Sequence, residues 1–145
     1  MKHAPSITTR NFWLSAVAGG YGGIFLQTAI VLLYEPVDFS ELWATPVIIL
    51  VYGLIALPFT ALGIALFGLP VANVLLSKAE KWWIGLVAIL WGAASGKLMF
   101  WAVDHFLFMG FYQFWKIQLL DMGLIYGIPT ALAFWLLLRR EIGES

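Results

Sequence analysis

Long apolar stretches, separated by short polar segments, follow one another along this chain. A helix that crosses a membrane needs about 20 consecutive residues that are mostly apolar. Four stretches meet this requirement, over about residues 12–34, 46–76, 82–103 and 122–138. We therefore expect an all-α, polytopic membrane protein in which residues 1–145 form one transmembrane domain, a compact bundle of four helices.

Two segments depart from the pattern of a simple span. The second stretch is long and contains Pro58 and the step Gly68–Leu69–Pro70, which predict a kinked or tilted helix. Residues 104–121, between the third and fourth spans, are too rich in aromatic side chains for a free loop. This segment either extends the third helix or forms an interfacial helix, and the pattern leaves both alternatives open.

The composition strengthens the membrane assignment. Hydrophobic residues make up 62% of the chain and charged residues 11%, and the mean hydropathy is +0.91. A soluble domain typically carries about 25% charged residues. The net charge is zero, so we expect no nucleic-acid partner. The chain has no cysteine, which excludes disulfides, thiolate metal sites and cysteine nucleophiles.

The distribution of basic residues predicts the orientation of the chain. With four spans, most of these residues fall on the side of the membrane where both termini lie: Lys2, Arg10, Lys78, Lys81, Arg139 and Arg140. Because basic residues concentrate on the cytoplasmic side, we expect both termini in the cytoplasm. We expect the protein in a bacterial inner membrane, surrounded by membrane lipid.

Small residues recur at the GxxxG-like spacing of four on three of the predicted helices. They are Ser15, Gly19 and Gly23 in the first span, Ala88, Gly92 and Gly96 in the third, and Gly123, Gly127 and Ala131 in the fourth. Lipid tails give helices no hydrophobic reason to associate, so close packing depends on faces of this kind. They predict either tight packing inside the bundle or a docking face for another membrane protein or a second copy.

One charged residue, Lys97, lies well inside a predicted span, about 21 Å along the helix from Trp83. A charge at such a depth costs about 2.5–3.5 kcal/mol on insertion scales, so it needs a polar partner or a wet cavity. The polar residues expected near it are Gln27, Tyr52, Asp104, His105, Asp121 and Tyr126. Lys97 either extends to the outer headgroups, forms a structural ion pair, or lines a functional site.

The chain has no nucleophile elbow, phosphate loop, dinucleotide-binding turn or metal-ligand spacing. We therefore expect no catalytic residue, no cofactor and no metal. The leading hypothesis is a small accessory protein that docks, through its small-residue helix faces, to a larger membrane complex or a membrane-inserted partner. The alternatives are an oligomeric channel or transporter with a polar site around Lys97, and a small integral membrane enzyme.

Overall fold

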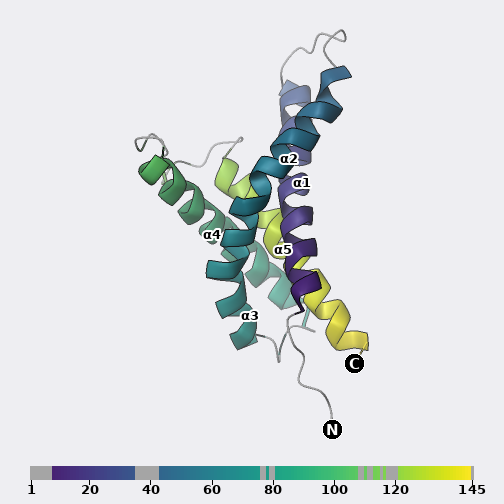
Figure 1. Cartoon of the computed structure of the whole chain (residues 1–145). Helices are drawn as coiled ribbons and strands as arrows, with labels where there is room; N and C mark the ends of the chain where they lie inside the picture. The colour runs from purple at the N-terminus through teal and green to yellow at the C-terminus, as the bar shows by residue number, and fades with distance from the viewer. Residues whose placement is uncertain are drawn as a thin grey trace.

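The computed structural model shows a bundle of helices (Figure 1). It describes residues 8–34, 43–75, 78, 81–107, 110, 113–114, 116 and 121–144. The helices in chain order are α1 (Thr9–Tyr34), α2 (Thr45–Gly63), the π-helical segment η2 (Ile64–Gly68), α3 (Leu69–Leu75), α4 (Trp83–Leu107) and α5 (Met122–Glu144). Within these residues, four helical stretches are long and apolar enough to cross a membrane: Thr9–Tyr34, Thr45–Leu75, Trp83–Leu107 and Met122–Glu141. This confirms the predicted all-α bundle with four spans.

The start of α1 and the end of α5 lie at the same end of the bundle. The Thr8 hydroxyl donates a hydrogen bond to Glu141 Oε1 at 3.0 Å. We call this end, at which Figure 1 marks both chain termini, the terminal end, and the other the far end.

The irregularity predicted in the second span takes the form of a π-helical turn. Pro70 has no N–H, and its ring would clash with the carbonyl of Leu66, four residues earlier, in a regular α-helix. The turn widens just before this point, where the Leu69 N–H donates to the carbonyl of Ile64, five residues earlier. The π-helical turn thus lies directly before Pro70, whereas α2 remains a regular α-helix through Pro58.

Helices α4 and α5 touch backbone to backbone. A Cβ atom built on Gly92 would lie 2.6 Å from the Gly127 carbonyl oxygen and equally close to the Ala131 side chain. A Cβ built on Gly96 would overlap the Gly123 carbonyl. Two small-residue faces predicted from the sequence therefore contact each other, and a larger side chain at Gly92 or Gly96 would force the helices apart.

Helix α1 uses its small residues in the same way, against α5 and α2. A Cβ built on Gly19 would overlap the Thr130 side chain, and one built on Gly23 would overlap the Tyr126 ring. On another face, Gly20 approaches the Gly53 carbonyl of α2, at 3.5 Å from a built Cβ. Ser15 is fully buried and donates to the carbonyl of its own helix four residues earlier. The face of α1 is thus occupied inside the chain.

The bundle consists of two helix pairs that cross. Helix α2 packs mainly on α1, and α4 mainly on α5. Figure 1 shows the far ends of α2 and α4 splayed apart, with α2 at the top of the view and α4 at the left.

The third span extends past its predicted end, because α4 continues to Leu107. Residues 104–107 of the aromatic segment are therefore helical. The described residues between α4 and α5, which are 110, 113, 114, 116 and 121, are not helical. The remainder of the segment for which we considered an interfacial helix lies outside the described residues.

Candidate functional site

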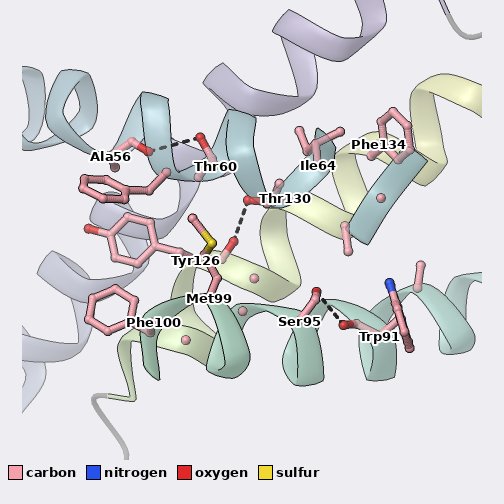
Figure 2. A pocket seen from close by; sticks show the side chains of 18 of the residues that line it. Ala56, Thr60, Ile64, Trp91, Ser95, Met99, Phe100, Tyr126, Thr130 and Phe134 are labelled. Carbon is pink, nitrogen blue, oxygen red and sulfur yellow. Dashed lines mark hydrogen bonds between the residues drawn. The ribbon is translucent and has the colours of Figure 1, made fainter. Parts of the chain in front are cut away.

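A groove of about 460 Å³ opens between the α2–η2–α3 rod and the α4–α5 pair (Figure 2). Its wall on α4 runs from Ile84 to Asp104, and 20 residues of α-helix are about 30 Å long. Its wall on the opposite rod runs from Tyr52 to Leu75. The hydrocarbon core of a bilayer is also about 30 Å thick. The groove therefore runs along most of the length of α4 and of the α2–η2–α3 rod.

The threonine and serine hydroxyls that line the groove donate their hydrogen bonds to backbone carbonyls (Figure 2). Thr60 donates to the carbonyl of Ala16 at 3.0 Å as well as to its own helix. Ser95 and Thr130 each donate to the carbonyl four residues earlier, at 2.7 and 2.6 Å. Because each hydroxyl proton is already engaged, the walls present an almost entirely apolar surface to an occupant.

One pair of predicted polar residues meets at the edge of the groove. The Tyr126 hydroxyl donates to Gln27 Oε1 at 3.1 Å, which links α5 to α1. Both residues line the groove, as do Tyr52 and Ala88. The bond adds a polar contact to the packing of the Tyr126 ring against Gly23.

A second pair is buried away from the groove. Lys97 Nζ lies 2.6 Å from Asp121 Oδ2 and also donates to the Lys116 carbonyl at 2.8 Å. The two charged side chains are 10% and 2% exposed, so Lys97 does not extend to the headgroups. Its ammonium also lies 5.9 Å from the centre of the Phe114 ring. The other oxygen of Asp121 accepts from the Leu124 N–H at 3.3 Å and caps α5.

These contacts place Lys116 and Asp121 beside Lys97, well before the end of α4. Helix α4 continues for ten residues beyond Lys97, which is about 15 Å. Even so, Lys116 and Asp121 both contact Lys97. Non-helical backbone at membrane depth is tolerated only where protein or water satisfies its polar groups. Lys97 donates such a hydrogen bond to the Lys116 carbonyl.

The structure brings together four of the seven polar residues predicted from the sequence, in two pairs. Lys97 pairs with Asp121, and Gln27 pairs with Tyr126. Asp104 lines the far end of the groove, and its carbonyl accepts from the Gly110 N–H at 3.1 Å. His105 stacks on Trp101 with ring centres 5.5 Å apart. Among the described residues, no three His, Asp or Glu side chains gather where they could hold a metal ion.

Sequence reasoning missed two parts of the site. The Lys116 carbonyl gives no signal in a sequence, because every residue carries a carbonyl. The groove also gives none, because it arises from the way in which two helix pairs cross and not from a motif. No protein family model, no curated protein and no solved structure matches this chain, so its function has to be inferred from the geometry.

Proposed function

We propose that the protein is a small integral membrane accessory protein that seats one transmembrane helix of a partner protein in the groove. The observation that carries this proposal is the length of the groove, which matches a helix that crosses the whole bilayer. A lipid tail reaches through one leaflet only, about half of that depth.

The chemistry of the walls supports an apolar occupant. The hydroxyls of Thr60, Ser95 and Thr130 are bonded to backbone carbonyls, so the groove offers few groups to a polar cargo. Lys97 and Asp121 are engaged with each other and are not among the residues that line the groove. This arrangement favours the accessory function over a channel or transporter with a polar site around Lys97.

The groove replaces the small-residue faces as the proposed docking surface. Those faces are used for contacts among α1, α4 and α5, whereas the groove is open. In this proposal the terminal end, which carries Lys81 and Arg139, faces the cytoplasm of a bacterium, following the positive-inside rule.

Site-specific photo-cross-linking in the native membrane tests the proposal. A benzophenone amino acid replaces Phe100, which lines the groove, or Phe25, which is 66% exposed on α1 and does not line it. We expect the Phe100 probe to form an adduct with a foreign polypeptide, joined within a predicted transmembrane segment of that polypeptide. The Phe25 probe should give lipid adducts only.

Two results would overturn the proposal. Lipid adducts alone at Phe100 would show that the groove faces the bilayer. An adduct of twice the mass of the chain would show that a second copy fills the groove, and the protein would then be a self-assembling one.

A further inference from the structure

Helices α4 and α5 run antiparallel, and their register can be followed to the terminal end. Near the middle of the pair, a Cβ built on Gly92 would lie 2.6 Å from the Gly127 carbonyl oxygen. About two turns nearer the terminal end, a Cβ built on Gly85 would lie 2.9 Å from the Trp135 ring. The two helices therefore stay in contact up to the first turn of α4.

One turn beyond this contact, each of the two segments carries a basic residue. Lys81 lies four residues before Gly85, and its carbonyl accepts from the Ile84 N–H at 3.1 Å, which ties it to the start of α4. Arg139 lies four residues after Trp135, on α5. The same register thus brings Lys81 and Arg139 to one level, where both residues are exposed.

The Trp135 ring directs Arg139 toward α4. The guanidinium carbon of Arg139 lies 5.5 Å from the centre of this ring, and the ring itself packs on Gly85 of α4. Such a cation–π contact is favourable even at an exposed site. Arg139 is therefore held over the surface that α5 shares with α4.

Neither cation has a counter-ion within the described part of the chain. No described carboxylate forms an ion pair with Lys81 or Arg139. Glu141, two residues after Arg139, accepts instead from the Thr8 hydroxyl of α1. Like charges at one level repel each other, so an anion between them would be stabilised by both.

The surroundings of the two cations are those of a lipid headgroup region. Trp82 follows Lys81 directly and is exposed, and Leu86 and Leu90 continue an exposed apolar face of α4 at a spacing of four. Tryptophan is enriched where headgroups meet hydrocarbon. An anion at this level, beside an apolar face that lipid tails cover, is the phosphate of a membrane lipid and not a soluble phosphate.

From these observations we infer that Arg139 and Lys81 form a binding site for the phosphate of an anionic membrane lipid. The planar guanidinium can donate two parallel hydrogen bonds to phosphate oxygens, and the lysine adds a point charge from the neighbouring segment. Basic pockets between membrane-spanning helices bind anionic headgroups in this way. The inference goes beyond the proposed function and does not depend on the groove, because neither residue lines it.

Native mass spectrometry of the purified chain in detergent tests the inference, with phosphatidylglycerol or phosphatidylcholine of equal chain length as the added lipid. We expect the parent chain to bind one phosphatidylglycerol more tightly than one phosphatidylcholine. Arg139→Gln or Lys81→Gln should weaken phosphatidylglycerol binding about fivefold, and the double variant about thirtyfold, because each basic residue contributes separately to the attraction. Arg10→Gln is the matched control: it removes an exposed cation at the same end, on α1, which packs on α5 and α2. It should change the affinity by less than about twofold.

Several results would overturn the inference. Equal binding of the two lipids by the parent chain would do so, as would a loss in Arg10→Gln as large as in the double variant, because the affinity would then follow the net charge of this end alone. Displacement of the bound lipid by inorganic phosphate would show a site for a soluble anion instead. The substituted residues are exposed, so the variants should melt like the parent chain. If Arg139→Gln melts early, Lys81→Gln decides, and unchanged binding in that variant would overturn the inference.

Discussion

Breaking the buried pair from either side should destabilise the protein far more than removing the pair as a whole. Asp121→Asn keeps a side chain that can cap α5 but removes the carboxylate that lies 2.6 Å from the Lys97 ammonium. Lys97→Met leaves the Asp121 carboxylate, 2% exposed, with its bond from the Leu124 N–H. Removing one partner of a buried ion pair typically costs about 3–5 kcal/mol.

The double variant Lys97→Met/Asp121→Asn should recover most of this loss, because replacing a buried pair by uncharged groups is often close to neutral. The free energy of unfolding is measured for all four chains in bicelles, with tryptophan fluorescence as the signal. The double-mutant cycle should give a coupling free energy above about 2 kcal/mol. Lys81→Met, at an exposed lysine, is the control and should change stability by less than about 0.5 kcal/mol.

Losses of less than about 1 kcal/mol in each single variant, adding in the double variant, would contradict a buried ion pair. That result would mean that water or lipid headgroups reach Lys97, and that the connection between α4 and α5 is not held at this depth.

Three further predictions follow from the topology and the packing. A cysteine introduced at Ser40 should react with an impermeant maleimide added outside the cell, and one at Ser145 should not; the reverse labelling would contradict the orientation. Gly92→Leu should destabilise the bundle by at least about 1–3 kcal/mol in thermal or chemical unfolding, whereas Gly63→Leu should not; equal stability of the two would contradict the backbone contact. Tyr126→Phe should lower the free energy of unfolding by about 0.6 kcal/mol, the average for an interhelical hydrogen bond in a membrane, and no change would mean that the hydroxyl finds an equal partner.

The helices could be predicted from the sequence because the bilayer imposes a fixed length of apolar residues. The predicted starts of the four spans lie within three residues of the observed ones, which are Thr9, Thr45, Trp83 and Met122. The irregularity of the second span was predictable for the same kind of reason, since a proline inside a helix removes a hydrogen bond wherever it occurs.

The sequence limited the possible partners of Lys97 to a few polar residues but did not indicate which of them pairs with it. Its burial required a polar partner, and Asp121 was one of several candidates at a similar depth. The aromatic character of residues 104–121 indicated an interface. The depth of Lys116 depends instead on a bond from Lys97 to a backbone carbonyl. Such a bond is a tertiary contact, and the hydropathy pattern of the chain does not indicate it.

The groove could not be predicted from the sequence for a related reason. Gly63 and Gly92 are both glycines in predicted spans, yet one faces open space and the other a neighbouring backbone. Which of the two situations applies is decided by the crossing of the helix pairs, and only the structure shows it.

Native mass spectrometry of the protein released from its own membrane tests the central claim most directly. We expect a complex of one copy of this chain with one foreign transmembrane polypeptide. A bare monomer that carries only lipid, or a homogeneous assembly of this chain alone, would contradict the claim that the groove seats a partner helix.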